Sequence, residues 1–174
     1  MARTLKTEAI VLKKKPLLNK DALVFLFSKE QGKIVASAKG IKKITSRRSP
    51  HLETGNLISA FFSRKGERLY LQETKLISGF SELKRDQKKI SRLYQFFYIL
   101  EKLLPENQKE DIVYNLTKSF LVKLSQSASD YDILSLYLNK LLMALGYSRQ
   151  SHGIIELEAI ISDLINEKMP SFNI

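Results

Sequence analysis

A run of basic side chains is the feature of this sequence that most clearly suits chemistry. The stretch A38-K-G-I-K-K-I-T-S-R-R-S-P-H-L-E-T-G55 has no carboxylate before Glu53. Its five cations are Lys39, Lys42, Lys43, Arg47 and Arg48. Side chains of this kind attract phosphates, and their binding releases the counterions of a polyanion. The stretch is therefore either a solvated spacer or an anion-binding loop, and we favour the second interpretation.

The charge of the chain is concentrated in its first part. Residues 1–80 contain 17 Lys and Arg against 6 Asp and Glu, whereas residues 81–174 contain 12 of each. The net charge of +11 therefore belongs entirely to the first part. Solubility alone requires no such segregation. The imbalance points to a polyanionic partner, such as a nucleic acid, for one part of the chain.

The residues that usually perform catalysis are scarce or badly spaced. The chain has no Cys, which excludes disulfides and thiolate metal sites, and its two His residues, His51 and His152, are far apart in sequence. Acidic pairs such as Glu156 and Glu158 are two residues apart, and side chains at that spacing on a helix do not face each other. We therefore predict a non-enzymatic protein without a cofactor or a metal site.

Five short apolar segments predict strands in the first part of the chain. Alternating or aromatic-rich patterns cover residues 7–13, 22–28, 33–39, 57–63 and 68–75. The turns K29-E-Q-G32 and R64-K-G-E67 place Gly where a hairpin favours positive φ. Five such strands in about 75 residues predict a small closed or partly open barrel.

Further candidate DNA-binding residues lie on the predicted turns and strands. They are Lys13 and Lys15 after the first strand, and Arg64, Lys65 and Arg68 around the last hairpin. If Leu69 and Leu71 face inward, Tyr70 faces outward, where an aromatic ring can stack on a base. The alternative is that Tyr70, like Phe61, packs against the helical part of the chain.

The second part of the chain reads as helices. Apolar residues recur at helical spacing over residues 90–104, 111–124, 130–145 and 154–168, with Pro105 as a stop and Gly146 as a C-terminal cap. The change from strand to helical spacing of the apolar residues occurs where the excess of positive charge ends. We predict an α+β protein with two domains, a nucleic-acid-binding barrel at 1–79 and an all-α helical domain for partner docking at 80–174.

Three segments resemble the N-terminal domain of the bacterial RecO recombination mediators. They are T7-E-A-I-V-L-K-K-K-P-L-L-N-K-D-A-L-V-F-L-F-S-K-E-Q-G-K-I34, A38-K-G-I-K-K-I-T-S-R-R48 and L69-Y-L-Q-E-T-K-L-I-S-G-F80. The likeness is close over residues 5–80 and is mainly a helical pattern over 81–174. It implies an OB-fold followed by a helical domain, with the cations of residues 39–48 contacting DNA.

The resemblance also implies activity and partners. RecO proteins bind single- and double-stranded DNA, anneal complementary strands, and work with RecR to load RecA onto DNA coated by single-strand-binding protein. They dock the acidic C-terminal tail of that coating protein on the helical domain. The basic residues that could neighbour such a tail here are Lys118, Lys123, Lys140 and Arg149.

The sequence departs from many members of that family in one place. Many carry a four-cysteine zinc module after a segment like L-L-M-A-L-G-Y, whereas here S148-R-Q-S-H-G153 leads directly to the last predicted helix. A zinc site is therefore not expected, and any partner surface built on that module is in doubt.

Other interpretations make different predictions. An RNA- or ribosome-associated OB-fold protein would prefer structured RNA to DNA, a protein-only adaptor with a basic docking loop would not bind nucleic acid at physiological salt, and a nuclease would cleave strands in the presence of a metal. Because there is neither a secretory signal nor a long apolar run, we expect a cytoplasmic, nucleoid-associated protein without membrane contact.

Overall fold

The structure is a computed structural model that describes residues 3–128 and 130–169. Its contacts divide the chain into two compact units. The barrel unit comprises residues 1–79 and 105–110, and the helical unit comprises residues 80–104 and 111–174. The segment 105–110, which the sequence analysis gives to the helical domain, thus belongs to the barrel unit.

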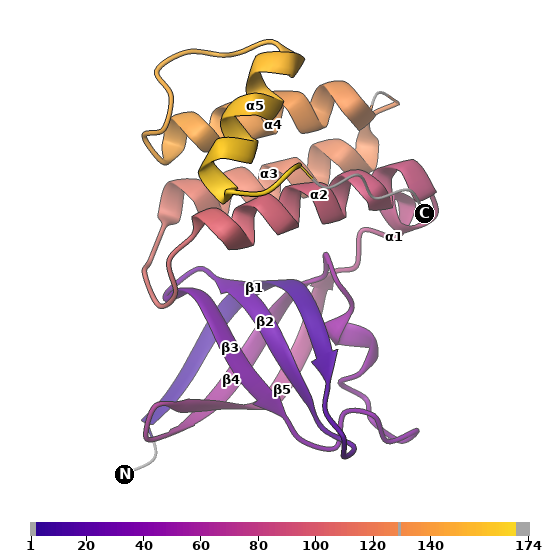
Figure 1. Ribbon diagram of the computed structural model, residues 1–174. Coiled ribbons are helices and arrows are strands. Elements are labelled where there is room, and N and C mark those ends of the chain that lie inside the picture. The colour runs from indigo at the N-terminus through magenta and orange to yellow at the C-terminus, as the bar shows by residue number, and fades with distance from the viewer. Residues whose placement is uncertain (1–2, 129, 170–174) are drawn as a thin grey trace. The chain divides into compact units, whose positions relative to one another are not determined.

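The barrel unit is a closed barrel of five strands (Figure 1). The strands are β1 (Arg3–Pro16), β2 (Ala22–Ser28), β3 (Gly32–Ala38), β4 (Leu57–Lys65) and β5 (Arg68–Ser78). They follow each other around the barrel in the order β1-β2-β3-β5-β4, with β1 also paired to β4. The predicted OB-fold barrel in an α+β layout is confirmed, and β1 and β5 are longer than their sequence patterns indicate.

Strand alternation builds the core of the barrel. Ile58, Ala60 and Phe62 of β4 are at most 1% exposed and belong to one apolar cluster with Leu69 and Leu71 of β5. Residues between them, Phe61 and Tyr70, are half-buried and lie on the outer face. The predicted inward face of β5 and the outward position of Tyr70 are therefore confirmed, and β4 alternates in the same way.

A single parallel pairing closes the barrel. The β3 residues Ala36 and Ser37 pair with Leu69 and Tyr70 of β5, whereas all other strand neighbours are antiparallel. Two parallel strands cannot be joined by a two-residue hairpin and need a longer crossover connection. Here the crossover from β3 to β5 runs through the basic loop, a short 3₁₀ helix (Pro50–Leu52) and β4. The basic loop thus lies within the connection that barrel closure requires.

The segment 105–110 is held against the start of β3. The backbone N–H of Asn107 donates to the carbonyl oxygen of Lys33 at 2.9 Å, and Lys33 also forms an isolated bridge with Glu106. Gly32 has a φ of +70°, and a Cβ added there would lie 1.7 Å from the carbonyl oxygen of Gln108. Only glycine can therefore occupy this turn without displacing the segment.

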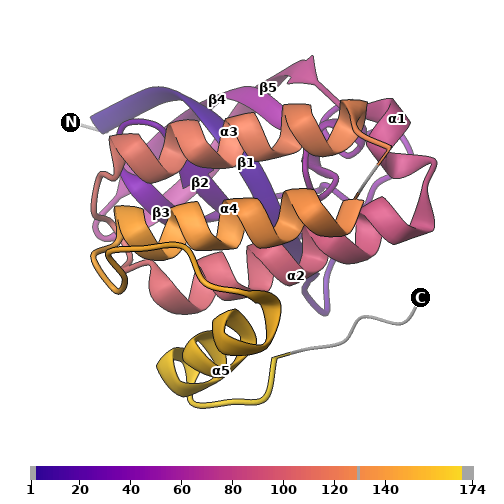
Figure 2. The ribbon, with the colours of Figure 1, turned by 90° about the horizontal axis from the view of Figure 1, so that it is seen from above.

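The described residues of the helical unit form five helices, and Figure 2 shows α3 and α4 running side by side with α5 set at an angle. They are α1 (Ser81–Lys84), α2 (Gln87–Leu103), α3 (Asp111–Gln126), α4 (Asp130–Ala144) and α5 (Ile154–Ile165). The Phe96 and Phe120 rings stack with centroids 4.1 Å apart, and Tyr137 packs on Phe120 at 5.5 Å. This aromatic chain joins α2, α3 and α4.

Local sequence signals set the helix ends. The carboxylate of Asp86 accepts hydrogen bonds from the backbone N–H groups of Lys88 and Lys89 and caps α2. At the end of α4, the N–H of Tyr147 donates to the carbonyl of Leu142 at 2.9 Å across Gly146, as in a Schellman cap. The four long helices predicted from the sequence are confirmed, while the single turn of α1 carries too short a pattern to predict.

The segment after α5 is tied to α2 by a small polar cluster. Tyr98 donates a hydrogen bond to the carboxylate of Glu167, and the Lys102 ammonium lies 2.6 Å from the same carboxylate. The hydrogen bond from Lys102 lowers the pKa of Glu167 and raises the pKa of Lys102, while the hydrogen bond to Glu167 raises the pKa of Tyr98. The ion pair between Lys102 and Glu167 is therefore present while the carboxyl is ionised and is lost as the pH falls through the lowered pKa of Glu167.

Among residues 3–128 and 130–169, no helix combines the length and apolar character that crossing a bilayer requires.

We predict that Gly32→Ala destabilises the barrel more than Gly66→Ala. Both glycines have positive φ, but the Cβ at Gly66 would meet open space. Gly66→Ala should lower the free energy of unfolding by about 1–2 kcal/mol through backbone strain alone. Gly32→Ala adds an overpacking penalty of roughly 1–3 kcal/mol against Gln108. Urea unfolding of both variants measures the difference, and equal losses would contradict the close contact.

Candidate nucleic-acid interface

The basic loop is anchored by apolar side chains. Ile41, which lies between Lys39 and Lys42, and Leu52, which follows the last cation, are 1% and 0% exposed and belong to the apolar cluster of the barrel. The loop between them forms successive turns, with hydrogen bonds from the N–H of Lys43 to the carbonyl of Gly40 and from the N–H of Ser46 to that of Lys43. The stretch is therefore a folded part of the barrel and not a loose spacer.

A carboxylate fastens this loop to the β1–β2 connection. Asp21 Oδ1 accepts a 2.7 Å hydrogen bond from the backbone N–H of Gly40. The next contacts come from Lys42, whose N–H donates to the carbonyl of Lys20 at 3.0 Å and whose Nζ donates to the carbonyl of Leu17 at 2.5 Å. The ammonium of Lys42, a predicted phosphate ligand, is thus engaged in joining two loops.

Arg48 acts as a second fastener. Its guanidinium donates to three carbonyl oxygens, those of Leu71 (2.8 Å), Gln72 (3.2 Å) and Lys39 (2.6 Å). These bonds join the loop to β5 and to the end of β3. They occupy most of the N–H groups of the Arg48 guanidinium, which the sequence predicts to bind phosphate. Lys43 and Arg47, by contrast, are exposed on the loop surface.

A groove of about 330 Å³ brings four of the predicted residues together. Its lining residues are Lys39, Arg48, Ser63, Lys65, Tyr70, Leu71 and Gln72. The Nζ of Lys39 lies 5.4 Å from the centroid of the Tyr70 ring, and Gln72 donates to the hydroxyl of Ser63 at 2.8 Å. The groove thus combines an aromatic face, two exposed ammonium groups and polar donors, which suits a base and its flanking phosphates.

A second aromatic–cation pair lies on the outer face of β1 and β2. Lys13 pairs with Phe25 in the strand register, and its Nζ lies 4.5 Å from the centroid of the Phe25 ring. The sequence leaves the direction of the Phe25 side chain undecided because both faces of its strand are apolar. Its neighbours Val24 and Leu26 belong to the barrel core. Because side chains alternate along a strand, Phe25 between them faces outward.

The two pairs share one side of the barrel. Phe25 pairs with Val35, and Ser37, two residues further along β3, pairs with Tyr70. Strand spacings place the two aromatic residues roughly 12 Å apart on the sheet. The face between them is short enough for one single strand to contact both rings.

The remaining basic candidates are dispersed. Lys15 and Arg68 are exposed at the ends of β1 and β5. Arg64 donates to the side-chain oxygen of Gln31 at 3.3 Å and so contacts the β2–β3 turn. Lys65 alone of the predicted hairpin cations joins the groove.

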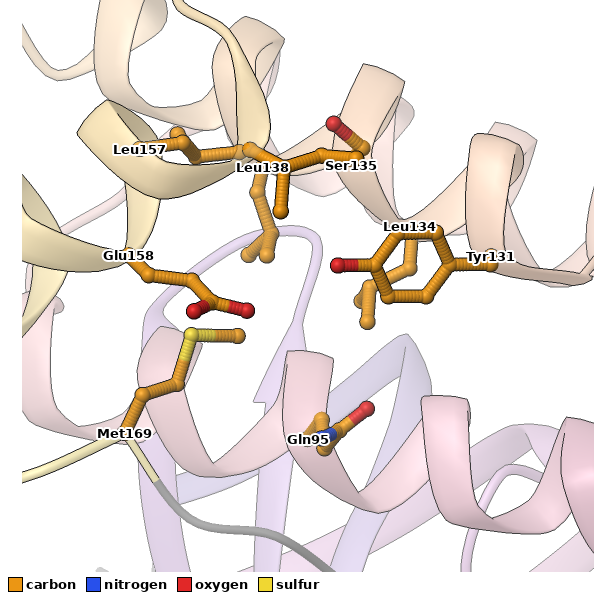
Figure 3. Close-up of a pocket in the computed structure, with 9 residues that line it drawn as sticks. Gln95, Tyr131, Leu134, Ser135, Leu138, Leu157, Glu158 and Met169 are labelled. Atoms are coloured by element: carbon orange, nitrogen blue, oxygen red, sulfur yellow. The ribbon is translucent and has the colours of Figure 1, made fainter.

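The helical unit has its own small cavity, about 30 Å³, between α2, α4 and α5 (Figure 3). Apolar residues line most of it, while the Glu158 carboxylate and the Tyr131 hydroxyl point into it from opposite sides. None of the four predicted partner-binding cations lines this cavity. Lys118 and Lys123 lie on α3, Lys140 lies on α4 with its Nζ 4.9 Å from the Tyr137 ring centroid, and Arg149 follows α4.

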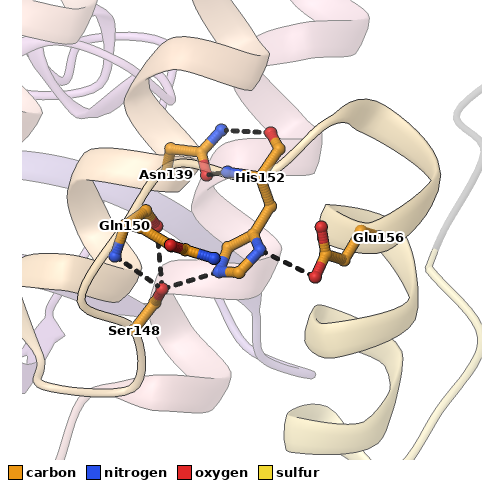
Figure 4. Close-up of polar contacts among 5 residues, drawn as sticks. All are labelled: Asn139, Ser148, Gln150, His152 and Glu156. Carbon is orange, nitrogen blue, oxygen red and sulfur yellow. Dashed lines mark hydrogen bonds and ion pairs between the residues drawn. The ribbon is translucent and has the colours of Figure 1, made fainter.

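A polar network fixes the connection between α4 and α5 (Figure 4). The side-chain amide of Asn139 exchanges hydrogen bonds with the backbone of His152, donating at 3.1 Å and accepting at 2.8 Å. The His152 ring contacts the Ser148 hydroxyl at 2.7 Å and the Glu156 carboxylate at 3.1 Å. Within the part of the chain that the structure describes, no three His, Cys, Asp or Glu side chains gather to hold a metal ion.

The strand order, the helical companion unit and the basic outer face define an OB-fold protein with a charged, aromatic surface. Comparisons with known proteins place it more narrowly. Residues 1–80 match the family described as "Recombination protein O N terminal".

Curated relatives extend the likeness beyond the barrel. The "DNA repair protein RecO" of Caldanaerobacter subterraneus subsp. tengcongensis is 31% identical over 147 residues, covering 83% of this chain and 59% of the relative. That of Thermoanaerobacter sp. is 32% identical over 85% of this chain and 60% of the relative, and that of Acetivibrio thermocellus is 27% identical over 91% and 64%. The chain belongs to the RecO family, and it spans about three fifths of the length of the first two relatives.

We predict that Arg48→Lys destabilises the barrel whereas Arg47→Lys does not. A lysine ammonium cannot reach three carbonyls in the fixed geometry of a guanidinium, so Arg48→Lys should lower the free energy of unfolding by about 1–2 kcal/mol. The exposed control Arg47→Lys should stay within about 0.5 kcal/mol of the parent. Urea titration measures the free energy of unfolding of both variants. An equal loss in Arg47→Lys would contradict the inference that Arg48 holds the loop in place.

Proposed function

We propose that this chain binds DNA through the outer face of its barrel and acts as a non-enzymatic recombination mediator in DNA repair. In this role it anneals complementary strands and helps to load a recombinase onto single-stranded DNA coated by single-strand-binding protein. The observation that carries the proposal is the groove in which Lys39, Lys65 and Tyr70 meet beside the anchored basic loop. Its place of action would be the bacterial nucleoid, in the cytoplasm.

The proposed binding is mainly electrostatic. Lys39, Lys43, Arg47 and Lys65 are exposed on one folded surface, where they can neutralise phosphates along a strand. Contacts of this kind fix the path of the backbone and carry little sequence information. We therefore expect weak sequence preference and binding to both single and double strands.

The same surface accounts for annealing. Two strands approach slowly because their phosphates repel each other, and cations held at fixed positions reduce that repulsion. Tyr70 and Phe25 can hold bases by their faces, which leaves the pairing edges of neighbouring bases open. The barrel would thus present one strand to its complement.

We assign partner docking to the helical unit. On α4, Lys140 lies between the exposed apolar residues Leu136 and Met143, at spacings of four and three that place all three on one helix face. A surface with apolar and basic character suits the acidic C-terminal tail of single-strand-binding protein, with Lys118, Lys123 and Arg149 as further cations. The cavity near Glu158 is less suited because its carboxylate repels an acidic tail. RecR is the second proposed partner.

The decisive test is binding of a labelled single-stranded oligonucleotide across a salt series. A variant with Lys39, Lys43, Arg47 and Lys65 changed to Ala should reduce the slope of log affinity against log salt by roughly 3, because four phosphate contacts are lost. Lys42 and Arg48 stay in place so that the loop remains fastened.

The matched control removes the same charge from the helical unit through Lys88, Lys123, Lys140 and Arg149, and its slope should not change. An equal fall in the control would show that diffuse charge and not the groove binds DNA. Absence of binding by the parent at moderate salt would favour the protein-only adaptor, and preference for a structured RNA competitor would favour the ribosome-associated alternative.

We predict that Tyr70→Leu and Phe25→Leu each weaken single-strand binding without changing its salt slope. Loss of a stacked base should reduce the binding free energy by about 1–3 kcal/mol while the phosphate contacts remain. Phe61→Leu is the control, since Phe61 is half-buried on the outer face of β4 but does not line the groove. Fluorescence anisotropy measures all three, and equal effects would indicate altered packing and not stacking.

A further inference from the structure

Two aliphatic side chains of the barrel unit are fully exposed. Leu18 has a relative exposure of 110% and Ile44 of 105%, so neither gains any burial from folding. Other exposed aliphatic residues of this unit, such as Leu76 at 40%, remain partly covered. Scattered exposed aliphatics are normal on protein surfaces, so exposure alone assigns no role to Leu18 and Ile44.

Both side chains lie at the tips of loops whose bases are closed by backbone hydrogen bonds. The loop carrying Leu18 is closed by a hydrogen bond from the N–H of Leu17 to the carbonyl of Asp21 at 3.1 Å, and Ile44 lies in the turn closed by Lys43 and Ser46 at 2.9 Å. The Lys42 and Asp21 contacts described above join the two loops. In Figure 1 the β1–β2 connection and the connection after β3 lie at the same end of the barrel.

Exposed cations lie near the two tips along the chain. Lys15, Lys20, Lys43 and Arg47 are exposed on these loops or at the adjoining strand end. The carboxylate next to Lys20 in sequence, Asp21, accepts hydrogen bonds from Gly40 and Asn19. Apolar tips within a cationic rim combine affinity for phosphates with side chains that can enter a base stack.

We propose that Leu18 and Ile44 form a wedge that inserts between bases of a bound nucleic acid and unstacks them. This inference rests on the proposed function, because the surrounding cations must first hold the phosphate backbone. The wedge would open short hairpins in a single strand, which must be removed before its complement can pair. The rings of Tyr70 and Phe25 on the same barrel favour a nucleic acid over a lipid surface, since they suit the faces of exposed bases.

The test uses a hairpin oligonucleotide with 2-aminopurine in its stem, whose fluorescence rises when the base unstacks. The parent protein should raise the fluorescence on binding, and the double variant Leu18→Ser with Ile44→Ser should lose at least two thirds of that rise. Its affinity should fall less than tenfold and its salt slope should not change, because the cations remain. The control is Ile112→Ser with Ile155→Ser, which removes two exposed aliphatic side chains from the helical unit and should behave as the parent.

Each other outcome overturns the wedge in a distinguishable way. A parent that binds the hairpin without a rise in fluorescence, or a double variant with the full rise, removes the wedge and leaves the proposed DNA binding intact. A parent that does not bind the hairpin at low salt removes both proposals. Binding to phosphatidylserine vesicles that the double variant abolishes, with the full fluorescence rise retained, would assign the tips to a membrane surface instead.

Discussion

Burial of Ile41 and Leu52 in the barrel is the interaction on which the basic surface depends. Five cations within ten residues repel each other, and such a segment on its own would stay extended in water. Two apolar side chains are buried in the barrel, Ile41 between Lys39 and Lys42 and Leu52 after Arg48, and each burial offsets that repulsion by roughly 1.5–3 kcal/mol. The same burial completes the crossover that lets β5 pair in parallel with β3, so barrel closure and presentation of charge have one cause.

The cations of the loop divide into two groups with different tasks. Lys42 and Arg48 donate to backbone carbonyls of neighbouring segments and hold the loop in place. Lys43 and Arg47 stand exposed between them. Because the first pair fixes the loop backbone, only the side chains of the second pair have to be ordered when a phosphate binds, which reduces the entropy lost on binding. The cations of the loop look equivalent in the sequence, but Lys42 and Arg48 stabilise the fold while Lys43 and Arg47 remain exposed to a ligand.

The separation of charge between the two units fits a division of labour. The barrel unit carries nearly all of the positive excess. Residues 81–174 are balanced in charge, and an aromatic chain of Phe96, Phe120 and Tyr137 joins three of their helices. A surface of balanced charge attracts a polyanion less strongly than the barrel does, and its local stripe of Leu136, Lys140 and Met143 is the surface that we propose for a protein partner. The polar network around His152 holds the connection between α4 and α5 by side-chain and backbone hydrogen bonds.

The sequence by itself determined the strands, the four long helices, the inward and outward faces of β4 and β5, and the location of the excess charge. These features depend on local periodicity and turn chemistry, which a single sequence displays directly. Only the tertiary structure decided which cations meet. Arg48 contacts carbonyls over twenty residues away, Phe25 is revealed as an outward ring only by its core neighbours, and residues 105–110 join the barrel through Lys33. Each of these depends on contacts between segments distant in sequence, whose partners no local pattern specifies.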